Sequence, residues 1–343
     1  MRKKVTIKDI AKELGIHHTT VSLALRNSGS IREETRERVW KKAREMGYRP
    51  NRLAQDFRNR RSSTVGVLVP SIRHHFFAKF IAEITERAGE TGFSVMVFQS
   101  NERRETEKRN VETLIDNRVA GVIASISKET TDPAHFELFL REEIPLVFFD
   151  RVPEMDHVSR VLTDNFRGAY DAVSLMIRAG RRRIAFITGA SHLNVYHDRL
   201  QGYRKALEDH GLPFSEQWLV VGDFFMEDGI RGAAQLMSLS RKPDAILAVG
   251  DDVGIGAIKY LKSAGYRIPQ DVAVVGFDND PMGQAIDPEL TTVEQPIAEM
   301  AEASFSILSE QILSGKREPV EKTLSPRLLI RESCVYPMVE VSQ

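Results

Sequence analysis

Hydrogen-bonding side chains follow one another in the run His17-His18-Thr19-Thr20-Val21-Ser22, directly after a turn signal at Gly15-Ile16. At helical spacing, Val21, Ala24 and Leu25 share one apolar face, and the polar side chains point the other way. The outward set is His18, Thr19, Ser22 and Leu23. Such a face can read base edges in the major groove, so the run indicates a DNA-binding surface.

Two further helices are expected to hold this surface in place. Thr6 can act as the N-cap of a first helix, with Asp9 three residues later as an acidic capping-box residue. Gly15 supplies the turn that ends this helix. A third helix is predicted over 33–46, with Gly47 just past its C-terminus. Residues 1–49 are therefore predicted to form an all-α helix-turn-helix headpiece.

The charge distribution supports double-stranded DNA as the partner of this headpiece. Residues 1–62 hold 17 Lys and Arg against 7 Asp and Glu, a net charge of +10. The rest of the chain holds 31 against 41, a net charge of −10. A basic end favours a polyphosphate partner, because neutralised phosphates release counterions. The alternative is a solvated basic helix face.

A short segment over 50–62 is predicted to be a hinge helix. Pro50 stops the third helix, and Leu53, Ala54 and Phe57 share one side of the segment. A helix this short is marginal in water and needs an external contact to order it. Two such segments paired in a minor groove, with Phe57 wedged between base pairs, would supply that contact. A flexible basic linker is the alternative.

From residue 63 onward, buried-strand patterns alternate with helical ones. The predicted strands cover 64–69, 94–98, 119–124, 145–149, 184–188, 218–221, 245–249 and 272–277, and predicted helices include 77–89, 167–179, 199–210, 229–239 and 254–264. Repeated βα units predict parallel sheets with helices on both faces. This number of strands favours two doubly wound lobes, with a ligand in the cleft between them.

Several other classes of protein are not supported by the sequence. No apolar run is long enough to span a bilayer, and the N-terminus has no secretory pattern, so we expect a cytoplasmic protein without a membrane partner. Cys334 is the single cysteine, which excludes an internal disulfide, and we interpret it as an incidental thiol. Gly250 to Gly256 lack the full dinucleotide-binding spacing, and the adjacent pairs His17-His18 and His74-His75 do not suit a metal. No enzyme, cofactor or metal is expected.

A series of motifs resembles the lactose-repressor (LacI/GalR) family of bacterial transcription regulators. The motifs are VTIKDIAKELGIHHTTVSLALRN, TRERV and GYRPNRLA, followed by VGVLVP, HHFFAKF, FFDR, TDN, FITG, DRLQGY, VGFDN and TTVEQP. They occur in one order over nearly the whole chain. The resemblance implies a body like a periplasmic binding protein over 63–343. Its N-lobe is expected at about 63–162 and 293–322, and its C-lobe at about 163–292 and 323–343.

The resemblance also implies roles for residues of the headpiece and hinge. His18, Thr19 and Leu23 fall where the family reads bases, and Ser22 and Arg26 fall where it touches phosphate. The hinge contacts are Asn51, Arg52, Ala54 and Phe57, and Thr6, His17, Thr20 and Tyr48 complete the DNA-contacting set. Leu23 and Phe57 stand where the family commonly has Arg and Leu. We therefore expect an operator that differs at the base facing Leu23, where a thymine methyl could be contacted.

In the body, the resemblance places the ligand contacts between the lobes. The polar contacts are Asp150, Asp164, Arg199, Asp251 and Asp278, Phe76 and Phe224 are apolar walls, and His75 and Leu193 complete the set. Carboxylates, an arginine and aromatic faces suit a sugar. Leu193 and Val195, predicted in a loop before Arg199, replace the polar side chains of purine-responsive members. A purine effector is thus disfavoured, although it stays open.

These observations predict a homodimeric transcription regulator that binds a near-palindromic operator under the control of a small effector. We expect it to act as a repressor. The effector can be an inducer or a corepressor, depending on which lobe arrangement it prefers. The residues after Cys334 carry no apolar heptads, so a dimer without a tetramerising helix is expected. The alternative is a bilobal sugar-binding or sensor protein with no role on DNA.

Overall fold

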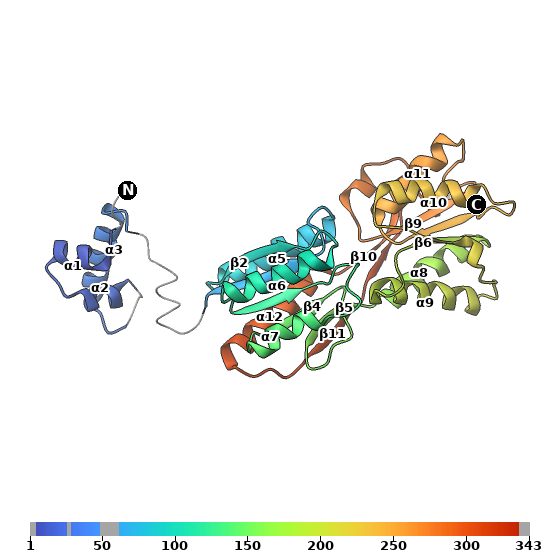
Figure 1. The fold of residues 1–343 in the computed structure, drawn as a ribbon. Coiled ribbons are helices and arrows are strands. Elements are labelled where there is room, and N and C mark those ends of the chain that lie inside the picture. Colours follow the sequence, from blue (N-terminus) through green and yellow to red (C-terminus); the bar gives the residue numbers. More distant parts are fainter. Residues whose placement is uncertain (1–4, 26–28, 49–61, 336–343) are drawn as a thin grey trace. The chain divides into compact units, whose positions relative to one another are not determined.

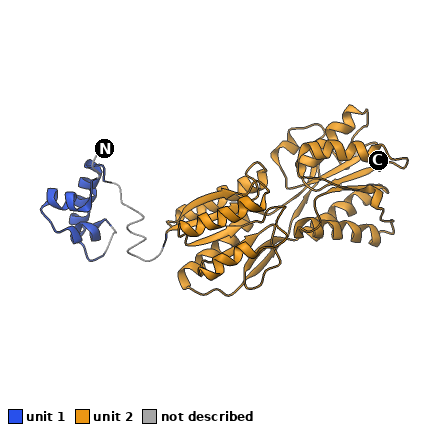
Figure 2. Cartoon of the chain, in the orientation of Figure 1, with its two compact units in different colours: residues 1–62 blue, residues 63–343 orange. Residues whose placement is uncertain are grey.

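The structure is a computed structural model, and it describes residues 5–25, 29–48 and 62–335. The chain divides into two compact units, residues 1–62 and residues 63–343 (Figure 2). Among the described residues, no helix is both long and apolar enough to cross a membrane.

The first unit is the predicted three-helix headpiece, with α1 at Ile7–Leu14, α2 at His18–Ala24 and α3 at Glu33–Glu45. The predicted capping box of α1 is present, because Thr6 N donates to Asp9 Oδ2 over 2.8 Å and Asp9 N donates to Thr6 Oγ1 over 3.4 Å. Gly15 ends α1 in the left-handed region at φ +62°. The helices enclose a small core of residues such as Val21 and Val39, both fully buried.

The second unit contains two six-stranded sheets, each with helices on both faces (Figure 1). The first sheet runs β11-β5-β4-β3-β1-β2. Its strands are β1 (Thr64–Val69), β2 (Ser94–Gln99), β3 (Gly121–Ala124), β4 (Leu146–Phe149), β5 (Ser159–Thr163) and β11 (Glu321–Leu324). Its helices are α5 (His75–Glu90), α6 (Arg104–Asp116), α7 (Glu137–Arg141) and α12 (Ile297–Ser314). Neighbouring strands pair in parallel throughout, as the βα pattern predicts.

The second sheet runs β12-β10-β9-β8-β6-β7, and only β12 is antiparallel to its neighbour. Its strands are β6 (Ile184–Thr188), β7 (Leu219–Val221), β8 (Ala245–Ala248), β9 (Ala273–Phe277), β10 (Thr291–Glu294) and β12 (Arg327–Leu329). Its helices are α8 (Asn165–Arg178), α9 (Asn194–Asp209), α10 (Met226–Met237) and α11 (Asp251–Ser263). We call the two layered halves of this unit the N-lobe and the C-lobe.

The sequence patterns missed four strands and misplaced one helix start. The missed strands β5, β10, β11 and β12 are short or rich in polar residues, and β11 is largely exposed. The predicted start of α9 at Arg199 was wrong, because the helix begins at Asn194. Val195 therefore lies in the first turn of α9, where the sequence predicted a loop.

The chain passes between the lobes three times, and these crossings frame the region where the lobes meet. The first crossing follows β5 at Asp164, the second joins β10 to α12 at Gln295-Pro296, and the third joins β11 to β12 at residues 325–326. Side chains at the ends of several strands converge beside these crossings.

Glycines allow the C-lobe helices to pack in close pairs. A Cβ on Gly202 of α9 would lie 2.1 Å from the carbonyl oxygen of Phe166, and one on Gly256 of α11 would lie 2.1 Å from that of Met226. Both neighbours are backbone atoms, which cannot rotate away. The spacings of α8 from α9 and of α10 from α11 therefore depend on these glycines.

We expect Gly202→Ala to lower the free energy of unfolding by about 1–3 kcal/mol, because the added methyl group forces α8 and α9 apart. Urea unfolding followed by circular dichroism measures the change. Gly89→Ala on α5 is the matched control, since a Cβ there meets nothing within 4 Å. The control is expected to be neutral or stabilising by up to about 1 kcal/mol. Equal effects of the two substitutions would refute the packing argument.

Candidate functional site

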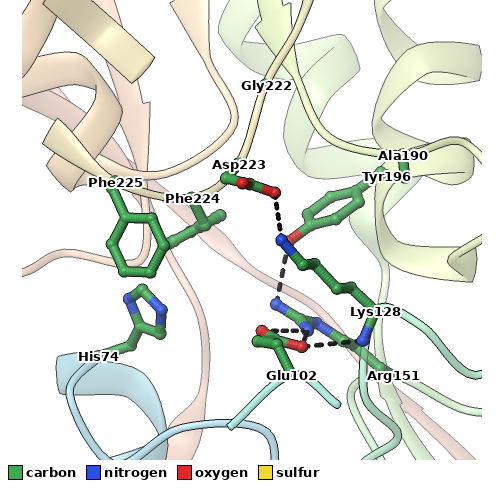
Figure 3. A pocket seen from close by; sticks show the side chains of 10 residues that line it. All are labelled: His74, Glu102, Lys128, Arg151, Ala190, Tyr196, Gly222, Asp223, Phe224 and Phe225. Carbon is green, nitrogen blue, oxygen red and sulfur yellow. Dashed lines mark hydrogen bonds and ion pairs between the residues drawn. The ribbon is translucent and has the colours of Figure 1, made fainter. Parts of the chain in front are cut away.

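Two adjoining cavities lie where the N-lobe and the C-lobe meet, with about 370 and 320 Å³ of empty space that includes open solvent. They share His74, Arg151, Tyr196 and Phe224. The part that we call the lysine half is also lined by Glu102, Lys128, Ala190, Gly222, Asp223 and Phe225 (Figure 3). The arginine half is also lined by Phe76, Phe77, Asp150, Val195, Arg199, Asp278 and Gln295. The two halves together form one candidate ligand site.

Arg199 is the central charge of the arginine half and is only 3% exposed. Its Nε donates to Asn165 Oδ1 over 2.8 Å, its Nη1 donates to the carbonyl oxygen of Val249, and its guanidinium lies 3.6 Å from the centroid of the Phe277 ring. Its Nη2 lies 3.9 Å from Asp278 Oδ1. Burial lowers the pKa of Arg199, and the nearby carboxylates oppose this shift.

Two carboxyl groups, Asp150 and Asp278, lie near this guanidinium, and Asp150 also lies near Arg151. Burial raises the pKa of Asp278 to about 7, although Arg199 and the amide of Gln295, which donates to Asp278 Oδ1 over 2.7 Å, favour the charged form. Burial also raises the pKa of Asp150. Both residues follow strands in the left-handed region, with φ +57° at Asp150 and +107° at Asp278. The arginine half therefore holds two carboxyl groups beside Arg199 and Arg151, and Arg151 is also paired with Glu102.

Aromatic rings form the walls between these polar groups. Phe76 and Phe77 come from α5, with ring centroids 5.1 Å apart, and Phe224 comes from the opposite lobe. The Phe224 ring lies 5.2 Å from His74 and 6.4 Å from Tyr196. Gly250 allows this position of Phe224, because a Cβ there would lie 1.9 Å from the ring.

The lysine half contains balanced charges that bridge the lobes. Arg151 Nη1 donates to both carboxylate oxygens of Glu102 at 2.8 and 3.0 Å, and its Nη2 donates to Tyr196 OH over 3.0 Å. Lys128 Nζ lies 2.6 Å from Asp223 Oδ1. Burial raises the pKa of Tyr196, so its hydroxyl stays protonated. Figure 3 shows these side chains pointing toward one another across the cavity.

Five residues of the predicted ligand set line the cavity: Phe76, Asp150, Arg199, Phe224 and Asp278. Leu193 and His75 do not line it. Leu193 is 1% exposed in the core and precedes α9, whereas its neighbour Val195 reaches the cavity. His74 lines both halves, whereas His75 does not. His74 is the N-cap residue of α5, and His75 is the first residue of the helix.

Two predicted aspartates, Asp164 and Asp251, also do not line the cavity. Asp164 caps α8 and accepts from Arg167 N over 2.9 Å. Asp251 accepts from Thr292 Oγ1 over 2.6 Å and from Asp280 N over 2.7 Å, inside the C-lobe. Burial and the neighbouring Asp278 charge raise the pKa of Asp251 well above its usual value. Asp251 thus ties together backbone segments beneath the site.

The lining also contains residues that the sequence did not indicate. Among them are His74, Glu102, Lys128, Arg151, Tyr196, Asp223, Phe225 and Gln295. Three of them stood beside a predicted site residue: Arg151 next to Asp150 in the motif FFDR, His74 next to His75, and Phe225 next to Phe224. The others lie on segments whose proximity depends on the packing of the two lobes.

On the headpiece, α2 presents a polar face. His18 and Thr19 are exposed, and Ser22 and Leu23 are half-buried. His17 caps α2, with Nδ1 accepting from Thr19 N over 3.3 Å. Of the other predicted contacts, Thr6 caps α1, and Thr20 and Tyr48 are half-buried. The predicted contacts Arg26, Asn51, Arg52, Ala54 and Phe57 lie outside the described residues.

Comparison with known proteins decides the family. A model for bacterial regulatory proteins of the lacI family matches residues 6–51, and a model for periplasmic binding protein-like domains matches residues 173–334. The HTH-type transcriptional repressor PurR of Escherichia coli O1:K1 / APEC is 31% identical over 329 residues, 96% of each chain. The chain belongs to the LacI family. It is therefore a DNA-binding transcription regulator with an effector-binding body, a class without enzymatic activity.

Solved structures of LacI-type regulators share the fold of this family member. The transcriptional regulator CelR in complex with cellobiose is 30% identical, with a TM-score of 0.74, and covers 96% of this chain and 100% of its own. The lac repressor dimer bound to operator and the anti-inducer ONPF is 25% identical, with a TM-score of 0.87 over 97% of this chain and 100% of its own. The prediction of a helix-turn-helix headpiece with a periplasmic-binding-protein-like body is confirmed.

The raised pKa of Asp278 predicts a pH dependence of stability. An aspartate in the unfolded chain loses its proton near pH 4, whereas folded Asp278 loses it near pH 7. Between these values the folded state holds the extra proton, so the free energy of unfolding falls as pH rises. Asparagine cannot titrate, so we expect the free energy of unfolding of Asp278→Asn to fall less steeply with pH than that of the wild type. The difference is expected to reach about 1.4 kcal/mol per pH unit.

Urea unfolding at several pH values between 5 and 8 tests this expectation. Asp271→Asn is the matched control, because the pKa of the exposed Asp271 is lowered to about 2 by hydrogen bonds from Arg267. The free energy of unfolding of Asp271→Asn, plotted against pH, should stay parallel to that of the wild type. A parallel curve for Asp278→Asn as well would contradict the assignment.

Proposed function

We propose that this chain is a homodimeric transcriptional repressor that binds a near-palindromic operator, and that a neutral carbohydrate in the interlobe cavity controls its operator affinity. Two observations carry the proposal: residues 1–62 hold a basic helix-turn-helix, and the following unit of the chain holds a cavity with acceptor groups and aromatic walls beside three interlobe crossings. An effector that binds one lobe arrangement more tightly than the other shifts the equilibrium between them. The change in DNA affinity is limited by this difference in effector affinity.

Operator binding is supported by the headpiece. Its net charge of +10 across residues 1–62 favours phosphate contact, and His18 and Thr19 are exposed donors on α2. The PurR relatives are named as repressors, and the lac repressor in the similar structure is a dimer bound to operator.

Dimer formation is supported by apolar groups at the edges of both sheets. Val97 of the edge strand β2 is 42% exposed, and Val221 of the edge strand β7 is 65% exposed. Ile72, whose backbone N–H is bonded to Gln99 of β2, is 49% exposed. A second copy of the chain would bury these side chains, as interface cores commonly do.

A neutral carbohydrate is supported by the balance of charge in the arginine half. Arg199 donates its hydrogen bonds to Asn165 and Val249, and Arg151 donates to Glu102, so the carboxyl oxygens of Asp150 and Asp278 are left to accept hydrogen bonds from a ligand. Sugar hydroxyls are such donors, and Phe76 and Phe224 can cover C–H faces of a ring. An anionic ligand would be repelled. A purine is the second candidate, because the relatives at 31% identity are named PurR.

The first test concerns DNA. Selection from a pool of random duplexes should enrich a near-palindromic site, and a single half-site should bind much more weakly if the chain acts as a dimer. Leu23→Arg should shift one symmetric position toward guanine, by about 1–3 kcal/mol per half-site, because arginine pairs with O6 and N7. Glu13→Gln on α1 adds the same charge and should leave the base preference unchanged. Failure to enrich any site refutes the regulator proposal.

The second test concerns the effector. A thermal-shift screen compares neutral sugars, including glucose and cellobiose, with glucuronate and hypoxanthine. A true ligand at one hundred times its Kd adds about 2.7 kcal/mol to the free energy of unfolding. We expect stabilisation by a neutral sugar and none by glucuronate, and Asp278→Asn should weaken the shift while Asp271→Asn retains it. Stabilisation by hypoxanthine alone would overturn the carbohydrate assignment.

A further inference from the structure

Lys128 is held at three points by groups from both lobes. Within its own lobe, Glu102 Oε2 accepts from Lys128 N over 2.8 Å. From the C-lobe, the ring Nε2 of His192 bonds the carbonyl oxygen of Lys128 over 2.7 Å, and Asp223 Oδ1 accepts from Lys128 Nζ over 2.6 Å. Both the backbone and the side chain of Lys128 thus bridge the lobes, and Figure 3 shows the side chain extending toward Asp223.

The turn that carries Lys128 is fixed from beneath by a fully buried carboxylate. Glu107 of α6 is 0% exposed, and it accepts from Ser127 N over 2.6 Å and from the hydroxyl of Thr130. Its Oε1 also lies 2.8 Å from Nε2 of the buried His135. Because Ser127 and Thr130 flank Lys128, this network within the N-lobe holds the turn in one position independently of its contacts with the C-lobe.

The C-lobe partners come from segments that border the cavity. His192 lies just before α9, and Asp223 follows β7. Lys128 and Asp223 line the lysine half, and their side chains are 39% and 52% exposed. The ion pair therefore lies at the solvent-facing edge of the site, whereas the Arg151 and Tyr196 bridge is buried.

We propose that Lys128, His192 and Asp223 form an interlobe clasp that holds the lobes together at the edge of the cavity. This inference rests on the proposed regulation through the cavity, and it assigns these residues a role in the equilibrium between closed and open lobes. The clasp favours the closed arrangement, because its contacts exist only when the lobes meet. An exposed ion pair of this kind changes such an equilibrium by about two- to five-fold and is weakened by salt.

The test measures the distance between the lobes by electron-electron double resonance on the full chain without DNA or added sugar. Nitroxide labels are placed at Glu112→Cys on α6 and Gln235→Cys on α10, both exposed, and labelled chains are diluted with unlabelled ones. Cys334 stays unlabelled, because it is 0% exposed and burial raises its thiol pKa to about 12.

We expect Lys128→Met and Asp223→Asn each to raise the ratio of open to closed chains about two- to five-fold. The charge reversal Lys128→Glu with Asp223→Lys should restore the wild-type ratio. Salt at about 1 M should open the wild type but not open Lys128→Met further.

The matched control is Lys108→Met, which removes an ion pair of similar exposure to Glu105 within α6 of the same lobe. It should leave the distances unchanged. The clasp is refuted if Lys128→Met gives the wild-type distribution, if Lys108→Met shifts it equally, or if charge reversal fails to restore it. The interlobe distances are measured without DNA or sugar. They therefore test the clasp even if the operator test or the effector test fails.

Discussion

The buried guanidinium of Arg199 is the group on which the arrangement of the cavity depends. Removing this charge from water is costly unless carboxylates, carbonyl oxygens and an aromatic face surround it. Its partners come from separate parts of the C-lobe: Asn165 at the start of α8, Val249 after β8, and Phe277 and Asp278 at the end of β9. The helix α9 and the strand ends must therefore keep fixed distances from one another.

The same charge connects the ligand site to the interlobe crossings. Asn165, which bonds Arg199, directly follows the first crossing, and Gln295, which bonds Asp278, lies in the second. A rotation of the lobes about the second crossing would move Gln295, the hydrogen-bond partner of Asp278. A ligand that donates hydrogen bonds to Asp150 and Asp278 would favour one arrangement of the lobes. This is a physical route from cavity occupancy to lobe position.

Charges that bridge the lobes occur in two environments with different physical consequences. The bridge from Arg151 to Tyr196 is buried, and its loss would leave a desolvated group without a partner. The ion pair from Lys128 to Asp223 is exposed, so water and salt can replace it at little cost. The buried bridge thus favours one arrangement of the lobes, and the exposed ion pair allows that arrangement to change.

The sequence by itself determined the headpiece, most of the strands and the family, because these depend on local signals. The capping pair Thr6 and Asp9, the turn at Gly15 and the apolar spacing of α2 act within a few residues of each other. Family motifs also indicated Asp150, Arg199 and Asp278, which line the cavity.

Only the tertiary structure decided which side chains share the cavity. The choice of His74 over His75 depends on where α5 begins, and Asp251 turns inward because Thr292 and the backbone of Asp280 reach it from later strands and loops. Glu102, Lys128, Tyr196 and Asp223 come from segments far apart in the chain, on both lobes. Local patterns predict helices and strands, but contacts between distant segments depend on packing and charge pairing that no local pattern encodes.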